Sequence, residues 1–350
     1  MKTSIIACIF LLSPIFLLAQ TKELIQETLQ IEHDKGRFNG TLLYADGKEL
    51  IKVNKGYSNF QFQVKINQDT RFPIASITKL FTSIALLKLQ ENGALNLNDK
   101  ASKYVSGLPK DCRNITIKDL LLHQSGLENE PIKAVTTKYN LNDYLTHFLK
   151  RSPNLDSSFN YNNVDYILLS KIIENITKED FEQAIEKLIL DPLDLKNTGF
   201  VKESDIIPNL AYGYHNYSFG EGSKDDPLHN DNRYLSNYYG AGAMYSTTED
   251  LYRFLEAIKN NLLLTPKTKD QLLLSTQNDE YIDWLSGKPT IGFYYVETDN
   301  TYRRSGSIDG FNSSIIISKD FNQILIILCN TDTADLENLA LEIFKKASVK

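Results

Sequence analysis

The sequence predicts an α+β fold, an α/β-type sandwich in which one antiparallel sheet is built from both chain ends, is flanked by helices and carries an inserted all-helical region. Three observations lead to this prediction. Stretches with strand patterns gather near the two ends, at residues 40–66 and 291–329. Stretches with apolar residues at helical spacing dominate the middle of the chain. The 350 residues, 42% of them hydrophobic and 23% charged, suffice for a folded unit with a sizeable core.

The first twenty residues differ from the rest. A short basic start precedes an almost unbroken apolar run over residues 5–18, and a polar stretch begins at Thr21. This pattern is typical of a secretory signal peptide spanning residues 1–20 and cleaved near Ala19 or Gln20. The alternative is an uncleaved anchor, but the apolar run is short for a bilayer span. We therefore expect an exported protein, periplasmic or secreted, without stable membrane insertion after cleavage.

The chain after this leader begins with a helix and then changes to strands. Residues 21 to about 35 have the apolar spacing of an amphipathic helix. Two strand patterns, 40–44 and 49–53, flank an Asp-Gly dipeptide, which is a strong hairpin signal. Alternating apolar residues indicate a further extended passage over 60–66. Pro73 marks its end, because proline cannot continue a strand ladder.

Helices are predicted for the next part of the chain. The first begins near Ser76 and ends at Glu91, with Gly93 as its stop signal. Thr116 is a good cap for another helix, because Asp119 follows at capping-box spacing. Residues 212–239 are polar and without periodicity, so we expect a long irregular segment. Further helices are predicted at residues 101–105, 117–123, 141–150, 165–175, 180–190 and 248–260.

The last third is rich in strand patterns and closes with a helix. Strands are predicted at residues 291–296, 301–307, 313–318 and 323–329, and the helix at 335–347. Residues 21–350 are therefore expected to form one unit with two parts. A sheet subdomain takes about 21–75 and 240–350, and a helical subdomain takes about 76–239.

Several function classes have no support in the sequence. The net charge is −6 and no long basic run occurs, so nucleic acid is not an expected partner. The five histidines form no close ligand pair, so no metal site is predicted. No phosphate-binding loop, dinucleotide fingerprint or Gly-x-Ser-x-Gly elbow occurs, and we expect no cofactor. Cys112 and Cys329 are expected to be buried free thiols rather than one disulfide bridge.

Ser76 and Lys79 form a Ser-x-x-Lys pattern at the start of a predicted helix. Residues three apart lie on one helix face, so the amine can reach the hydroxyl. Unpaired backbone N–H groups gather at this end of a helix. An amine with a lowered pKa can activate a serine oxygen as a nucleophile. The pattern also arises by chance, so the rest of the chain decides its meaning.

Two later stretches can be read beside this pattern. Tyr161 and Asn163 lie two apart in a polar stretch that leads into a helix, and can present a phenol and an amide to one cavity. The structural alternative is a helix cap by Asn162 or Asn163. Arg304, Ser305, Gly306 and Ser307 follow one another on a predicted strand, where glycine allows close approach of another backbone. The alternative there is an edge strand with two solvated arginines.

Taken in order, these three stretches resemble the serine β-lactamase and penicillin-binding protein superfamily, specifically its class C-like branch. The family pattern is Ser-x-x-Lys, then Tyr-x-Asn, then Lys- or His-x-Gly on a strand. Here it reads Ser76-x-x-Lys79, Tyr161-x-Asn163 and Arg304-Ser305-Gly306. The stretches at 120–127, 192–200 and 239–251 also look like this family, so the resemblance extends over about residues 38–329. It implies a β-lactamase/DD-peptidase-like fold.

The resemblance also implies a mechanism. Ser76 would attack a carbonyl and form an acyl-enzyme, with Lys79 and Tyr161 carrying the proton. The backbone N–H groups of Ser76 and Ser307 would form the oxyanion hole. Asn163 would hold a substrate amide, and Arg304 a substrate carboxylate in a site that includes Ser305 and Gly306. Arg304 departs from the family pattern, and its guanidinium is a poor proton carrier.

The expected function is therefore that of a serine hydrolase acting on an amide, a β-lactam or an ester, including D-amino-acid peptides. The partner is a small molecule or short peptide. The pattern does not separate β-lactamase, DD-peptidase, D-amino-acid peptidase and esterase, and it carries no information on the oligomeric state. The competing class is a non-catalytic protein of the same fold that binds peptidoglycan fragments or other ligands, which Arg304 keeps open.

Overall fold

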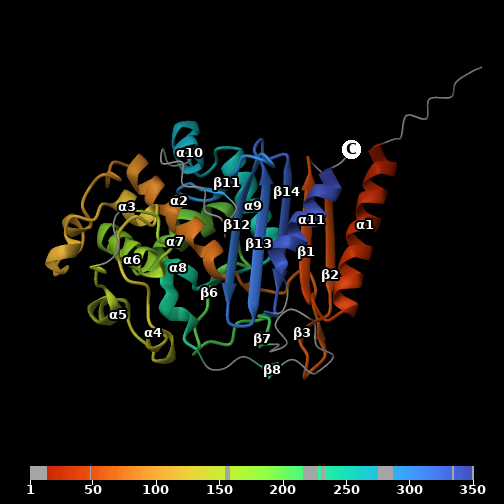
Figure 1. Ribbon diagram of the computed structural model, residues 1–350, viewed down its shortest axis with the longest axis horizontal. Helices are drawn as coiled ribbons and strands as arrows, with labels where there is room; N and C mark the ends of the chain where they lie inside the picture. The colour runs from red at the N-terminus through yellow and green to blue at the C-terminus, as the bar shows by residue number, and fades with distance from the viewer. Residues whose placement is uncertain are drawn as a thin grey trace, which may run out of the picture.

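The fold is described by a computed structural model that covers residues 14–47, 49–153, 158–215, 228–229, 233–274, 287–332 and 335–348. Its centre is a seven-stranded antiparallel sheet in the order β10-β11-β12-β13-β14-β1-β2 (Figure 1). The N-terminal hairpin therefore pairs with the last strand of the chain, and the sheet is built from both chain ends as predicted. The strands are β1 (Gly40–Asp46), β2 (Glu49–Lys55), β10 (Lys288–Pro289), β11 (Tyr294–Val296), β12 (Thr301–Ile308), β13 (Phe311–Ser318) and β14 (Gln323–Cys329).

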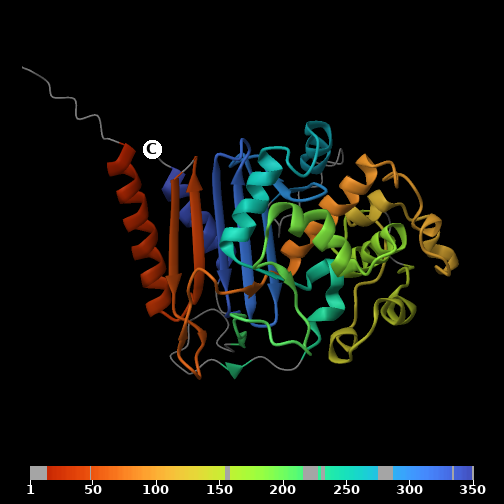
Figure 2. The same cartoon turned by 180° about the vertical axis from the view of Figure 1, so that it is seen from behind.

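The period-two alternation of the strands divides their apolar side chains between two cores. On β1, Leu42 and Tyr44 point to the core shared with the terminal helices, and Leu43 and Ala45 point to the larger core under the central helices. The first face is covered by α1 (Pro14–Asp34) and α11 (Leu336–Ser348), with α1 beside β2 (Figure 1). The opposite face carries α9 (Thr248–Lys259) (Figure 2).

The middle of the chain forms the predicted helical region beside the sheet (Figure 1). It is joined to the rest by a small three-stranded sheet in the order β5-β9-β6, in which β5 pairs with β9. Its helices are α2 (Thr78–Glu91), α3 (Ile117–Leu121), α4 (Lys133–Thr136), α5 (Leu141–Phe148), α6 (Asn163–Thr177), α7 (Phe181–Ile185) and α8 (Tyr239–Gly242). The small strands are β5 (Phe72–Pro73), β6 (Gly199–Phe200) and β9 (Met244–Ser246).

Several local features predicted from the sequence are present in the structure. Thr116 and Asp119 form a capping box at the start of α3. Gly93 has φ +72° and follows the end of α2, a conformation that favours glycine. Cys112 and Cys329 are both buried and free. Among the described residues, none of the helices is both long enough and apolar enough to cross a membrane.

Other elements differ from the prediction. The passage over 60–66 is not one strand: only β3 (Tyr57–Asn59) and β4 (Val64–Lys65) pair, and Phe62 is exposed. The helix predicted at 180–190 is divided into α7 and one π-helical turn, η4 (Glu186–Leu190). The helix expected at 101–105 is a single 3-10 turn, η2 (Ala101–Lys103).

Two further differences concern the second half of the chain. Helix α10 (Pro266–Leu273) was not predicted, although Thr265 caps it and proline occupies its first position, a recognisable start signal. The strand expected at 291–296 begins only at Tyr294. Most of the segment expected to be irregular, 212–239, lies outside the described residues, apart from β7 (Tyr214–His215), β8 (Leu228–His229), the 3-10 turn η6 (Leu235–Tyr238) and its flanks.

Candidate active site

Ser76 lies on a tight turn between the small sheet and the central helix α2. The 3-10 turn η1 (Ala75–Ile77) precedes α2 directly, and the backbone N–H of Ile74 donates to the carbonyl of Met244 on β9 at 2.9 Å. Ala75 has φ +47°, a left-handed conformation that is rare for a residue with a side chain. Ala75 and Ile77 are buried, whereas Ser76, which lies between them, is partly exposed. The turn therefore presents the Ser76 hydroxyl at the start of a buried helix.

Lys79 is fully buried, and its ammonium makes three hydrogen bonds. It donates to Ser76 Oγ at 3.0 Å, to Asn163 Oδ1 at 2.7 Å and to the carbonyl of Ala241 at 2.8 Å. Burial is the main cause that lowers the pKa of Lys79, and Arg304 lowers it further, while Tyr161 and Glu130 act in the opposite direction. The position next to Ser76 thus holds an amine that gives up its proton more readily than an exposed lysine.

Tyr161 completes a hydrogen-bonded group around the serine oxygen. Its hydroxyl donates to Ser76 Oγ at 2.6 Å, and the Lys79 ammonium lies over its ring at 4.8 Å from the centroid. Burial alone would raise the pKa of Tyr161, but the positive charges of Lys79 and Arg304 and the hydrogen bond to Ser76 lower it below the usual phenol value. Two groups with lowered pKa values therefore contact the same oxygen.

The loop that carries Tyr161 is fixed by the start of α6. The Asn162 side chain accepts from the backbone N–H of Val164 at 2.7 Å and donates to the carbonyl of Leu127 at 2.6 Å. Asn162 is therefore a helix cap, as the structural alternative proposed, and this cap leaves the side chains on either side of it directed at Lys79 and Ser76. The two interpretations of this stretch are compatible.

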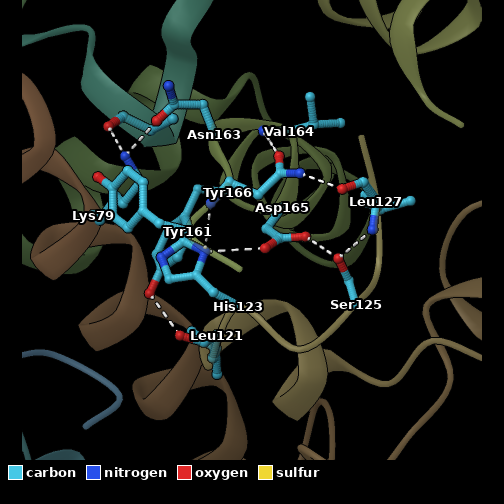
Figure 3. Close-up of polar contacts among 12 residues, drawn as sticks. Lys79, Leu121, His123, Ser125, Leu127, Tyr161, Asn163, Val164, Asp165 and Tyr166 are labelled. Carbon is cyan, nitrogen blue, oxygen red and sulfur yellow. Dashed lines mark hydrogen bonds and ion pairs between the residues drawn. The ribbon is translucent and has the colours of Figure 1, made fainter. Parts of the chain in front are cut away.

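Behind Tyr161 lies a buried polar cluster that the sequence analysis did not single out. His123 Nδ1 is 3.0 Å from Asp165 Oδ2, and Ser125 Oγ donates to the other oxygen of Asp165 (Figure 3). The His123 ring lies 4.6 Å from the Tyr161 ring. His123 is in the 120–127 stretch that resembles the family, but its contact with Asp165 joins residues 42 positions apart. No spacing rule predicts such a pair.

The hydrogen bonds of this cluster indicate that His123 and Asp165 are both neutral. The backbone N–H of Asn162 donates to His123 Nδ1 at 3.2 Å, so a lone pair of that nitrogen faces it. This contact is compatible with a neutral Asp165 carboxyl group that shares the same lone pair as a second donor. Burial raises the pKa of Asp165 well above its ordinary value and lowers the pKa of His123 well below its own, which agrees with this assignment.

The oxygen and the nitrogen of the Asn163 side-chain amide both make hydrogen bonds. Its oxygen accepts from Lys79, and its Nδ2 donates to Glu130 Oε1 at 2.7 Å. Glu130 was not among the predicted site residues. Burial raises the pKa of its carboxyl, while Asn163 and Lys79 act to lower it. The amide that was expected to hold a substrate thus has one of its two N–H groups bonded to a carboxylate.

Arg304 is buried, with 3% of its surface exposed. Its Nε and one terminal nitrogen both donate to the backbone carbonyl of Ser76, each at 3.1 Å. The guanidinium also lies over the Tyr294 ring at 5.6 Å. The alternative of an edge strand with two solvated arginines is wrong, because β12 lies between β11 and β13. Arg303 is ion-paired with Asp299.

The strand β12 brings the last group of predicted residues to the serine. Gly306 packs so closely on the turn that a Cβ there would lie 2.5 Å from the Ile74 carbonyl oxygen and 2.7 Å from the Ser76 nitrogen. A cavity of about 380 Å³ opens at this contact. The eight predicted site residues therefore lie together, since Lys79 and Asn163 are hydrogen-bonded behind the cavity. The cavity is lined by Ser76, Tyr161, Tyr294, Arg304, Ser305, Gly306, Ser307, Asn312, Ser313, Asp335, Leu336 and Glu337.

The arrangement suits nucleophilic chemistry. Its parts are a partly exposed hydroxyl, two adjacent groups able to accept the hydroxyl proton, and a strand backbone beside the cavity. In the part of the chain that the structure describes, no group of three or more histidine, cysteine, aspartate or glutamate side chains could hold a metal ion.

Comparisons with known proteins agree with this description. The sequence model of the Beta-lactamase family matches residues 25–347. Over 261 residues the chain is 33% identical to a teichoic acid D-alanine hydrolase of Staphylococcus aureus, an alignment that covers 73% of this chain and 64% of the relative. The chain thus spans less than two-thirds of that relative's length.

Solved structures give the same result for the fold. The structure is similar to FmtA from Staphylococcus aureus, with a TM-score of 0.79, 25% identity, and coverage of 93% of this chain and 87% of the other. It is also similar to a D-amino acid amidase from Ochrobactrum anthropi SV3, with a TM-score of 0.77, 21% identity, and coverage of 94% and 98%. The second likeness concerns the fold alone.

Proposed function

Because this chain belongs to the beta-lactamase family and is a serine hydrolase, we propose that Ser76 is its nucleophile and that it removes D-alanyl or similar aminoacyl groups from an ester or amide. The observation that carries the assignment is the hydrogen-bonded group of Ser76 Oγ, the Lys79 ammonium and the Tyr161 hydroxyl. Two proton-carrying groups with lowered pKa values on one serine oxygen are what acyl transfer requires.

In the first half of the proposed reaction, Ser76 Oγ attacks the carbonyl carbon while its proton passes to the Lys79–Tyr161 pair. The negative charge on the carbonyl oxygen is stabilised by the backbone N–H groups of Ser76 and Ser307, and one such donor contributes about 3 kcal/mol to the transition state. The tetrahedral intermediate collapses as the pair returns the proton to the leaving oxygen or nitrogen. In the second half, water attacks the acyl-enzyme through the same groups in reverse.

The choice of substrate rests on two observations. The relative with 33% identity is named for the hydrolysis of D-alanine from teichoic acid. Arg304, the residue expected to bind a substrate carboxylate, directs two of its donors to the Ser76 carbonyl. A guanidinium bound in this way has less capacity for a carboxylate on the leaving group. Both observations favour esters or amides without such a carboxylate over penicillins and D-Ala-D-Ala peptides.

We also propose that the protein is exported and that residues 1–20 are its signal peptide. Cleavage near Ala19 or Gln20 leaves the buried Ile25 and Leu29 of α1 in place, so the mature chain retains the core that α1 forms with the sheet. We further propose that residues 21–350 divide into a sheet subdomain, about 21–75 and 240–350, and a helical subdomain, about 76–239; the pairing of β1 with β14 supports this division.

The test is a pair of serine variants assayed with p-nitrophenyl acetate and D-alanine p-nitroanilide. Ser76→Ala should abolish turnover of both, because no other group replaces the attacking oxygen. Ser204→Ala, an exposed serine away from the cavity, is the matched control and should keep the activity of the wild type. Intact-protein mass spectrometry of acid-quenched reactions should show an acyl adduct that Ser76→Ala lacks. Retained turnover in a correctly folded Ser76→Ala protein would refute the assignment.

A further inference from the structure

We infer that the carboxylate of Glu130, held by Asn163 beside the nucleophile, forms a subsite for the free α-ammonium group of an aminoacyl substrate. The inference rests on the proposed function, because it concerns the acyl group that Ser76 would accept. Acyl groups whose α-nitrogen is already acylated are therefore expected to be poor substrates.

The position of Glu130 is fixed by contacts with the start of α6. Asn129 Oδ1 accepts from the backbone N–H of Asn163 at 3.1 Å and from that of Glu130 at 3.2 Å. Asn163 then bonds Glu130 through its Nδ2 and Lys79 through its Oδ1, each at 2.7 Å. The Asn163 amide is thus within two hydrogen bonds of Ser76 Oγ. A substituent on the acyl α-carbon, one bond from the attacked carbonyl, extends over this distance.

Glu130 changes the position beside Asn163 from one that donates hydrogen bonds to a substrate into one that accepts them. An N-acylated substrate has a carbonyl oxygen on its α-nitrogen, and that oxygen needs an N–H donor such as the Asn163 amide. Here one N–H of Asn163 is bonded to the carboxylate, and a carboxylate beside the remaining N–H repels a second acceptor. The same carboxylate attracts an ammonium group and accepts charge-assisted hydrogen bonds from it. The position therefore discriminates by attraction and by repulsion together.

The carboxylate also has capacity that the protein does not use. Among the described residues, the buried Glu130 Oε2 has no hydrogen-bond partner, a costly state for a carboxylate oxygen. The positive charge of Lys79 acts to lower the pKa of Glu130, but the three N–H groups of its ammonium donate to Ser76, Asn163 and Ala241. Glu130 as a whole remains partly exposed, although it does not itself line the 380 Å³ cavity. In the proposed complex its carboxylate turns toward the acyl group. An α-ammonium supplies both the counter-charge and the missing donor.

The experiment compares two substrates that differ only at the α-position, D-alanine p-nitroanilide and D-lactic acid p-nitroanilide. The readout is the ratio of their kcat/KM values, which cancels changes in the catalytic groups. Glu130→Gln keeps an oxygen for Asn163 but removes the charge, and should lower the ratio about 10- to 100-fold, the usual effect of losing a charge-assisted contact. Glu130→Asp keeps the charge and should retain part of the preference. Glu128→Gln, a partly exposed glutamate in the same loop, should leave the ratio unchanged.

Each outcome has one meaning. An unchanged ratio in Glu130→Gln, with both substrates slowed equally, would make Glu130 a positioning residue for Asn163 and overturn the subsite. The subsite would also be overturned if the wild-type protein showed no preference for the substrate with the amine. The same holds if it hydrolysed p-nitrophenyl acetate through Ser76 but neither anilide. Turnover that survives Ser76→Ala would instead overturn the proposed nucleophile. Circular dichroism of each variant verifies that the fold is intact.

Discussion

The contact between Gly306 and the Ser76 turn predicts that Gly306→Ala is harmful chiefly to catalysis. A methyl group at this position would lie 2.5 Å from the Ile74 carbonyl oxygen, 2.7 Å from the Ser76 nitrogen and 2.8 Å from Ser313 Oγ. Ser313 can rotate, although its hydroxyl bonds the Ile74 carbonyl at 2.9 Å. The other two atoms belong to the backbone of a turn that is bonded to β9 and continues into α2.

The geometry gives the size of the effect. Ordinary contact begins near 3.4 Å, so β12 and the turn must separate by roughly 0.7 to 0.9 Å. Overpacking of this kind costs about 1–3 kcal/mol of the free energy of unfolding. A misplacement of nearly 1 Å between catalytic groups costs about 100-fold in rate. We expect kcat to fall about 100-fold while the protein remains folded.

The assay is kcat for p-nitrophenyl acetate, with urea unfolding of the same protein. The matched control is Gly292→Ala, whose methyl group would meet Leu272 Cδ1 at 2.7 Å and Leu80 Cδ1 at 2.8 Å. These atoms are the ends of flexible side chains in the core, so this variant should lose stability but keep the kcat of the wild type. A Gly306→Ala protein with wild-type kcat would show that the close approach of β12 to the serine turn is not needed.

Two further predictions concern charge. Arg304→Met removes a positive charge that lowers the pKa of both Lys79 and Tyr161, so the acid limb of the pH profile of kcat/KM should move to higher pH. Arg304→Lys keeps the charge and should leave this limb in place. If the limb is unchanged in both variants, the assignment is contradicted. Asp165→Asn keeps the hydrogen bonds of the neutral Asp165 side chain but cannot ionise. Because burial raises the pKa of Asp165, its stabilising contribution is complete below the unfolded pKa and is lost as pH rises through the folded one. Urea unfolding should therefore show stability falling more steeply in the wild type than in the variant as pH rises above about 4, the pKa of an unfolded carboxyl group, and equal slopes would refute the neutral pair.

Elements with strong local signals were predicted more accurately than elements with weak ones. The Asp-Gly hairpin and the run 323–329 were predicted almost as they occur, because turn chemistry and a continuous apolar stretch specify them. Helix α10 has a Thr-Pro start but a weak apolar pattern, and it was not predicted. The 60–66 passage shows the opposite error. Its apolar alternation is present, but Phe62 is exposed, so the pattern does not report burial there.

The site could be predicted only as far as family motifs extend. Ser76 and Lys79 are neighbours on one helical turn, which spacing alone indicates. Tyr161 reaches Ser76 across 85 residues, and only the resemblance brought the two together. Glu130 and Asp165 escaped because each is defined by a partner in another segment, and isolated carboxyl groups carry no motif. Tertiary structure was needed to show that they are buried beside the catalytic groups.

The arginine in the third motif explains how the site accommodates its departure from the family pattern. A proton carrier at that position is unnecessary if Lys79 and Tyr161 exchange the proton of Ser76 between themselves, since both contact its oxygen. What the position must then supply is fixed positive charge and support for the turn. Arg304 has both properties: its charge lowers the pKa of both partners, and its two donors hold the Ser76 carbonyl. Its pKa is too high for it to lose that charge, so the field at the serine persists over the whole pH range in which the pair titrates.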